Sequence, residues 1–409
     1  MPTDPWREMP WRKLALAFLA LWLGLLWLSP SRDAALETRV DAVLKKALDS
    51  QEVVGAVVLI SLQGRLVYHR AVGFADREKG RAMREDTLFR LASMSKPIVS
   101  AAALALADVG KLSLDDPVTR FLPWFTPPLP DGGPAVITVR QLLNQTSGLN
   151  YGFQQSPDGP MIKAQVSDGL DDQDISLEEN LRRLATVRLS FAPGTQWGYS
   201  LATDALGAVV AQAGGASLPE VVKSLVTGPL GMTDTGFMAK DPERLEKPYV
   251  SEKARTRPMA QHEVVPNGHG LTVFEPARAL DPKAYPSGGA GLVGTAGDYL
   301  KFMEALRQGG DGVLKPETAR AMTTNQVGDM RVVVGPGWGF GYGLAVLKDK
   351  SRDKSQAGVG SWGWGGAYGT EFSVDPKAGL CLVVMTNTIP SGRAWNFPED
   401  VKNAVYEQE

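Results

Sequence analysis

Two pairs of strand-like runs, one pair near each end of the chain, most constrain how this sequence can fold. Residues 53–73 hold two apolar, β-branched runs around a Gln-Gly turn, and residues 370–385 hold two more around a turn with proline and glycine. Such runs, joined by short turns, predict antiparallel hairpins. Because the sequence between them is typical of helices and loops, we expect an α+β fold. One antiparallel sheet is built from both ends of the chain, and a mostly helical region, roughly residues 111–285, is inserted into it.

The globular part of the chain is expected to span residues 34–409. Residues 34–50 carry apolar side chains at the spacing of an amphipathic helix, which marks its start. Hydrophobic residues make up 44% of the 409-residue chain, enough for a large core. The single cysteine, Cys381, lies in the apolar run of a predicted strand, so we expect it to be buried, and no disulfide can form within the chain.

Residues 1–31 have the composition of an export signal or a short membrane anchor. Arg7, Arg12 and Lys13 precede fifteen apolar or glycine residues, 14–28, and polar residues follow. A helix of that length spans about 22 Å, against about 30 Å for the hydrocarbon core of a bilayer, which favours a cleaved signal peptide. No Ala-x-Ala cleavage site follows, so an uncleaved anchor at residues 14–28 stays open. Either way we expect an exported protein, periplasmic or secreted.

The net charge and its distribution limit the classes of partner that we expect. The net charge is −2 and no block of Lys and Arg stands out, so neither nucleic acid nor an anionic membrane surface is expected as a partner. Membrane contact is expected only through the N-terminal segment. A small-molecule substrate, an ester or an amide, fits this balance better.

Ser93 and Lys96 stand three residues apart at the start of an apolar helix. If the helix begins at Ser93, the two side chains share one face and the amine can reach the hydroxyl. The helix N-terminus also favours negative charge beside the serine. Pro97 is tolerated only in a first turn, and the almost uniformly apolar residues 98–107 mark a buried central helix. The arrangement is typical of a reactive serine with a lysine as proton acceptor.

The same motif has a simpler explanation, because Ser-x-x-Lys is short enough to occur by chance in a chain of this length. A second copy begins at Ser351 and ends at Lys354, in a polar stretch with no apolar helix behind it, and we interpret it as a solvated loop. On the pattern alone, a catalytic and a structural role for Ser93 stay equally open.

The histidines of the chain do not form a catalytic or metal-binding motif. The chain has three histidines, of which His69 lies in a predicted strand, and it has no Gly-x-Ser-x-Gly motif, so a Ser-His-Asp site is not expected. His262 and His269 are separated by proline and glycine, which break any helix that would align them as ligands. We therefore expect no metal and no cofactor.

Tyr199 is the better candidate for a second catalytic group. A Pro-Gly turn at residues 193–194 leads into a loop, and a helix that Ser200 can cap is predicted to follow. Tyr199 would lie where loop and helix meet, a place where side chains can face a cleft. A packing role for this aromatic ring stays open as the alternative.

Several separated motifs agree with those of one known family. Residues 89–97 and 110–117, with the sequences FRLASMSKP and GKLSLDDP, closely resemble the class C β-lactamase-like serine hydrolases, a superfamily that includes the family VIII carboxylesterases and the D-alanyl peptidases. The resemblance covers nearly everything after residue 35. It implies a β-lactamase/transpeptidase-like fold, in which helices flank both faces of the antiparallel sheet. Further matching motifs follow in the same order at residues 142–149, 228–232, 287–292 and 364–366.

The resemblance also implies a mechanism and a site. Ser93 would attack a carbonyl and form an acyl-enzyme, Lys96 and Tyr199 would share the proton, and water would release the acyl group. A tyrosine is a usable base near neutral pH only if a nearby positive charge favours its phenolate, so Lys96 would serve Tyr199 as an electrostatic partner. The backbone N–H groups of Ser93 and Ala367 would form the oxyanion hole.

Two departures from the family pattern bear on the substrate. Where the β-lactamases and peptidases carry Tyr-x-Asn, this chain has Leu201 in place of the amide, and where they carry Lys-Thr-Gly it has Trp364, Gly365 and Gly366. The cation that would hold a β-lactam or peptide carboxylate is missing, and a neutral, aromatic-walled site suits a short-chain, uncharged ester. The Trp-Gly-Gly version resembles the esterase branch. A β-lactamase or D-amino-acid peptidase is the alternative, and an inactive relative used as a binding or scaffold protein of the cell envelope is a less favoured one.

Overall fold

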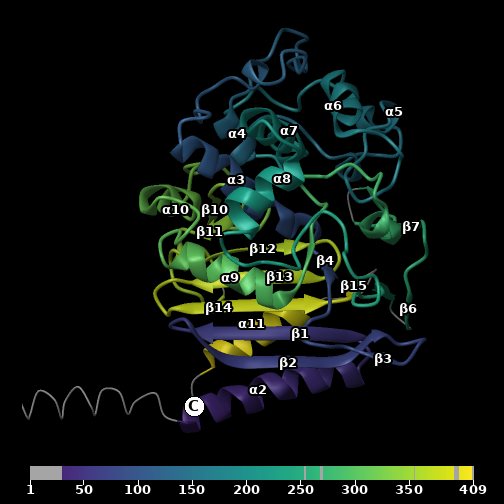
Figure 1. Cartoon of the computed structure of the whole chain (residues 1–409), viewed down its shortest axis with the longest axis vertical. Coiled ribbons are helices and arrows are strands. Elements are labelled where there is room, and N and C mark those ends of the chain that lie inside the picture. The colour runs from purple at the N-terminus through teal and green to yellow at the C-terminus, as the bar shows by residue number, and fades with distance from the viewer. Residues whose placement is uncertain (1–29, 253–254, 268–269, 354, 391–395, 408–409) are drawn as a thin grey trace, which may run out of the picture.

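The computed structural model describes residues 30–252, 255–267, 270–353, 355–390 and 396–407. They form an eight-stranded antiparallel sheet in the order β10-β11-β12-β13-β14-β1-β2-β3 (Figure 1). Strand β1 pairs with β14, so Ala56 lies opposite Thr386. The prediction of one sheet built from both ends of the chain is confirmed. The strands are β1 (Gly55–Leu62), β2 (Arg65–Asp76), β3 (Arg81–Ala82), β10 (Trp338–Phe340), β11 (Ala345–Leu347), β12 (Trp362–Gly366), β13 (Thr370–Asp375) and β14 (Leu380–Thr386).

Helices cover both faces of this sheet, as Figure 1 shows. Successive residues of a strand point to opposite faces, so Val58 of β1 packs with α2 and α11, whereas Val57 belongs to the larger core with α3 and α9. Cys381 is fully buried in this larger core, as predicted. The result is a helix–sheet–helix sandwich. Its helices are α2 (Pro30–Asp49), α3 (Ser95–Asp108), α9 (Ala296–Arg307) and α11 (Phe397–Tyr406).

The central helix α3 begins two residues later than predicted, at Ser95. A 3₁₀ turn, η1 (Ala92–Met94), comes first, and Ala92 has a φ of +44°, in the left-handed region that alanine rarely adopts. The chain therefore turns sharply at Ser93 before the α-helical hydrogen bonds begin. All residues from 95 to 106 are buried, as expected for a central helix.

The chain between β3 and β10 adds a helical layer and, together with β15 near the C-terminus, three small sheets. Helix α7 packs against α3, α4, α6 and α8. Strand β4 pairs with β9, β7 with β8, and β5 with both β6 and β15. The elements are β4 (Phe89–Arg90), η2 (Val118–Arg120), α4 (Val139–Leu143), η3 (Gly152–Gln154), α5 (Pro160–Lys163), α6 (Leu177–Ala185), α7 (Ala202–Gly214), α8 (Leu218–Val222), η4 (Lys223–Thr227), β5 (Tyr249–Ser251), β6 (Thr256–Pro258), β7 (Glu263–Pro266), β8 (Leu271–Phe274), η5 (Pro276–Leu280), β9 (Val293–Gly294), α10 (Pro316–Met322) and β15 (Thr388–Pro390).

The predicted signal peptide or anchor, with its apolar residues 14–28, lies outside the described residues. Among those that are described, no single helix is long and apolar enough to cross a membrane. Helix α7 reaches that length and hydropathy only together with residues 218–227, from which it is bent by 78°.

Candidate active site

Ser93 lies in the η1 turn, and hydrogen bonds hold the residues on either side of this turn in place. The Leu91 N–H donates to the Leu292 carbonyl at 2.9 Å, and the Ser95 hydroxyl accepts from the Leu292 N–H at 3.0 Å. Leu91 and Met94 are fully buried, whereas Ser93 is partly exposed. The turn thus presents the Ser93 side chain to a cavity while its neighbours anchor it in the core.

Tyr199 and Lys96 both reach the Ser93 hydroxyl. Tyr199 Oη lies 2.5 Å from Ser93 Oγ, and Lys96 Nζ donates to the same oxygen at 3.3 Å. Tyr199 comes from a loop 106 residues further along the chain. The structure therefore brings these three side chains together around one hydroxyl.

Lys96 is held between a carbonyl and two aromatic rings. Its side chain is completely buried, and Nζ donates to the Gly289 carbonyl at 2.9 Å. Nζ also lies 4.6 Å from the ring centroid of Tyr199 and 5.3 Å from that of Tyr151. Aromatic faces attract an ammonium. These contacts keep a compact positive charge beside the Tyr199 and Ser93 hydroxyls.

Gln145 holds the loop that carries Tyr199, and sequence reasoning did not assign it to the site. Its Oε1 accepts hydrogen bonds from the N–H and the hydroxyl of Ser200, both at 2.9 Å, and its carbonyl accepts from the Gly198 N–H at 2.9 Å. Gln145 is fully buried. It belongs to the motif at residues 142–149, but nothing in that motif shows its link to the Tyr199 loop.

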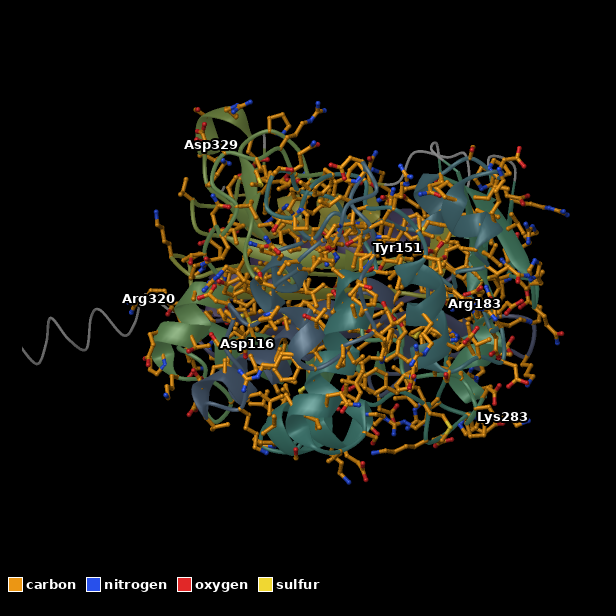
Figure 2. The ribbon with its side chains drawn as sticks, turned by 90° about the horizontal axis from the view of Figure 1, so that it is seen from above. Asp116, Tyr151, Arg183, Lys283, Arg320 and Asp329 are labelled. Carbon is orange, nitrogen blue, oxygen red and sulfur yellow. The ribbon has the colours of Figure 1, made fainter. Side chains whose placement is uncertain are left out.

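Aromatic rings surround Tyr199. The ring centroids of Tyr151 and Trp364 lie 5.1 and 5.4 Å from that of Tyr199, and the centroid of Trp197 lies 6.4 Å from it. Tyr151, labelled well inside the outline of the molecule in Figure 2, is buried. Tilted and stacked contacts of this kind hold a ring in one orientation, so they keep the Tyr199 hydroxyl directed at Ser93.

Strand β12 ends beside the Ser93 turn. A Cβ at Gly366 would lie 2.3 Å from the Leu91 carbonyl oxygen, so the close approach of the two segments requires glycine. Ala367, the next residue, lines the same cavity as Ser93, together with Trp364 and Gly365. The residues predicted for the oxyanion hole and the pocket wall thus border one cavity, with a single exception.

That exception is Leu201, for which the prediction of substrate contact is corrected. Its side chain is fully buried in the main core and does not border the cavity. The reason is that α7 begins at Ala202, so the chain has turned into the core two residues after Tyr199.

The cavity at Ser93 has a volume of about 770 Å³ and a largely apolar wall that includes Phe153, Phe274 and Trp338. The sequence predicts a neutral wall, but charged residues line the cavity. Lys402 is the only basic residue among its described lining residues, and four acidic residues also line it, which disfavours an anionic ligand. The four are Asp168, Asp353, Glu371 and Glu399.

Asp168 holds the turn that follows Tyr151. Its carboxylate accepts hydrogen bonds from the N–H groups of Gly152 at 2.7 Å and Phe153 at 2.9 Å. Burial raises the pKa of Asp168 to about 7, against the lowering effect of these two hydrogen bonds. The cavity therefore gains negative charge as the pH rises through neutrality.

The chain is similar to known proteins over most of its length. The family described as Beta-lactamase matches residues 40–401. Esterase EstB of Burkholderia gladioli is 46% identical over 378 residues, which cover 91% of this chain and 96% of that protein. Protein Rv1367c of Mycobacterium tuberculosis is 34% identical, over 85% of this chain and 89% of its own. The solved structure of EstCE1, described as a hydrolase with promiscuous acyltransferase activity, has a TM-score of 0.89 at 42% identity and covers 92% of this chain and 99% of its own. Because sequence and fold agree over nearly the whole described chain, this protein belongs to the β-lactamase family.

Proposed function

We propose that this chain is a serine carboxylesterase that hydrolyses short-chain, uncharged esters through an acyl-enzyme on Ser93. The observation that carries the proposal is the position of Ser93 Oγ, 2.5 Å from Tyr199 Oη and 3.3 Å from Lys96 Nζ, at the edge of an aromatic cavity. Two similar proteins, EstB and EstCE1, are described as an esterase and a hydrolase, which supports the same reaction here.

In the proposed reaction, Ser93 Oγ attacks the ester carbonyl carbon while Tyr199 Oη takes the hydroxyl proton. The Lys96 ammonium stabilises the negative charge on the phenol oxygen, and the N–H groups of Ser93 and Ala367 stabilise the oxyanion of the tetrahedral intermediate. Collapse of the intermediate breaks the ester C–O bond, and the alcohol leaves with the proton from Tyr199. Water then attacks the acyl-enzyme and gives a proton to Tyr199, which returns it to Ser93 as the acid is released.

The charges of the cavity support an ester over a β-lactam or a peptide. Penicillins, cephalosporins and D-alanyl peptides carry a carboxylate that the enzyme must hold. Trp364 stands where related β-lactamases place a lysine, and the lining residue Lys402 is already paired with Glu399 at 3.0 Å. A carboxylate substrate would therefore meet acidic residues without a free cation in the described wall, whereas an uncharged ester meets aromatic surface.

Turnover of three substrates by the purified protein tests this proposal. We expect kcat/KM for p-nitrophenyl butyrate to exceed that for a chromogenic cephalosporin or a D-Ala-D-Ala peptide by about a hundredfold, because neither carboxylate finds a partner. Faster turnover of the cephalosporin than of the ester would favour a β-lactamase. A protein that turns over none of the three would be the inactive binding protein instead.

We also propose that the chain is exported through its N-terminal segment. The order of basic, apolar and polar residues in positions 1–31 supports this. The mass of the protein recovered from periplasm, medium and membranes distinguishes a cleaved signal from an anchor at residues 14–28. Full-length protein found only in the cytoplasm would contradict export.

A further inference from the structure

A buried carboxylate that the reaction above does not use lies close to Lys96. Asp204 is in the first turn of α7, and its side chain is completely buried. Neither carboxylate oxygen has a hydrogen-bond partner of normal geometry within the part of the chain that the structure describes. A buried carboxylate in this state is strongly destabilising unless an opposite charge is near.

Gly289 allows Asp204 and Lys96 to face each other. The point that a Cβ of residue 289 would occupy lies 2.5 Å from Asp204 Oδ2, 3.1 Å from Tyr151 Oη and 3.5 Å from Lys96 Nζ. The Gly289 carbonyl also accepts the hydrogen bond from Lys96. Any side chain at this position would separate the carboxylate from the ammonium, whereas glycine leaves them in one buried space.

The groups around Asp204 act in opposite directions on the ionisation of its carboxyl. Burial raises the pKa of the Asp204 carboxyl above its ordinary value, and the Ser287 hydroxyl, the Lys96 ammonium and the Arg278 guanidinium offset part of this rise. Arg278 is itself engaged, because its guanidinium donates to two backbone carbonyls and lies 4.3 Å from the ring centroid of Tyr285. Lys96 is thus the cation available to pair with Asp204.

The other titratable groups near Asp204 do not compete for Lys96. Burial raises the pKa of Tyr151 and of Tyr285, so both hydroxyls stay neutral. The Asp168 carboxylate is bound to two backbone N–H groups. Tyr199 Oη is bound to Ser93.

We propose that Asp204 is a positioning residue, whose carboxylate is the counter-charge that keeps Lys96 in the ammonium form beside Tyr199. This inference rests on the proposed esterase function. A neutral amine at Lys96 would compete with Tyr199 for the Ser93 proton. With Asp204 ionised, the lysine keeps its own proton, and the Ser93 proton passes to Tyr199 Oη. Asp204 thereby decides which group is the base without touching the substrate.

The rate at which a fluorophosphonate labels Asp204→Asn across a range of pH tests this role. In the labelling reaction Ser93 Oγ bonds to phosphorus, fluoride leaves and Tyr199 takes the proton, so the rate reports activation of Ser93 whatever the natural ester. We expect the plateau rate to fall about tenfold or more. The acid limb should move to lower pH, because a carboxylate favours the protonated Lys96–Tyr199 pair and its removal lets the pair lose its proton at lower pH.

Two results would overturn the proposal. An unchanged labelling rate would show that the carboxylate is not needed, and a slower rate with an unmoved acid limb would show a merely structural role. A wild-type protein that is not labelled at all would instead contradict Ser93 as the nucleophile, and with it the proposed function.

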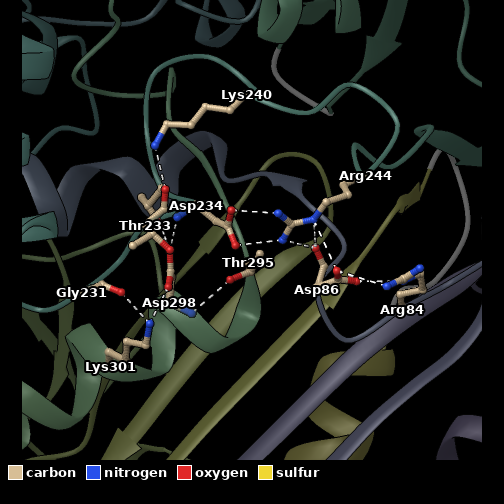
Figure 3. Close-up of polar contacts among 11 residues, drawn as sticks. Arg84, Asp86, Gly231, Thr233, Asp234, Lys240, Arg244, Thr295, Asp298 and Lys301 are labelled. Carbon is tan, nitrogen blue, oxygen red and sulfur yellow. Dashed lines mark hydrogen bonds and ion pairs between the residues drawn. The ribbon is translucent and has the colours of Figure 1, made fainter.

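Asp298→Asn is the matched control. Asp298 is also buried, but it lies in α9, where it accepts hydrogen bonds from the Asp234 N–H and from Lys301, both at 2.9 Å (Figure 3). It does not line the cavity. We expect this variant to keep the wild-type acid limb.

A second variant decides the question if Asp204→Asn alone does not fold. Removal of one partner of a buried ion pair leaves an unpaired charge, whereas removal of both does not. The Asp204→Asn/Lys96→Met double variant is therefore expected to melt at a higher temperature than Asp204→Asn. A double variant that melts at or below the single variant would show that the two charges are not paired.

Discussion

Replacement of Ser93 by alanine is expected to lower the hydrolysis of p-nitrophenyl butyrate by about a thousandfold or more, and to abolish labelling by a fluorophosphonate. Alanine keeps the backbone and Cβ of the η1 turn but removes the oxygen that Tyr199 and Lys96 contact at 2.5 and 3.3 Å. Without that oxygen no acyl-enzyme forms, and only attack by water, helped by the oxyanion donors, remains. Steady-state kcat/KM and the mass of the intact protein after labelling measure the two effects.

Ser351→Ala is the matched control for this prediction. Ser351 opens the second Ser-x-x-Lys sequence of the chain, but in the structure it is an exposed residue of the turn η6 (Lys350–Arg352), and its hydroxyl donates to Asp349 at 2.6 Å. Its replacement is expected to leave activity unchanged. Ester turnover that survives in Ser93→Ala, or that falls equally in Ser351→Ala, would contradict the assignment of the nucleophile.

The main sheet is predictable from the sequence because its signals are local. Alternating or continuous apolar runs around short turns mark β1, β2, β13 and β14 wherever they occur. The start of α3 is different, because Ala92 with its positive φ is flanked by Leu91 and Ser95, both of which are hydrogen-bonded to the distant Leu292. Pairings such as β5 with β15 also join segments far apart in the chain, and no local sequence pattern predicts them.

Some residues of the candidate site are likewise predictable from the local sequence, and others are not. Ser93 and Lys96 stand three residues apart, so helical spacing alone places them together. Tyr199 joins them across 106 residues, and the family resemblance was needed to single it out. Gln145 and Asp204 gave no signal, because lone amide and acidic residues are mostly exposed, and only tertiary packing shows that these two are buried beneath the site.

Tyr199→Phe is expected to lower kcat by about 10²- to 10⁴-fold with little change in KM. Phenylalanine keeps the ring and its contacts with Tyr151 and Trp364, and removes only the oxygen 2.5 Å from Ser93 Oγ. If that oxygen takes the serine proton, the loss falls on acylation, which pre-steady-state release of p-nitrophenol measures directly. Lys96 remains 3.3 Å from the hydroxyl and can replace part of the lost function, so the effect should not exceed that of Ser93→Ala.

Tyr68→Phe provides the control, because it removes a tyrosine hydroxyl that donates to Asp41 on the α2 face of the sheet, away from the cavity. Its kcat should match that of the wild type.

If Tyr199→Phe kept more than about a tenth of wild-type kcat while Lys96→Met were inactive, Lys96 would be the base and Tyr199 its support. Slow acylation in Tyr199→Phe would instead favour Tyr199 Oη as the base, with the buried Lys96 ammonium 4.6 Å from its ring centroid as electrostatic partner. Such a pair would let this chain activate a serine without a histidine.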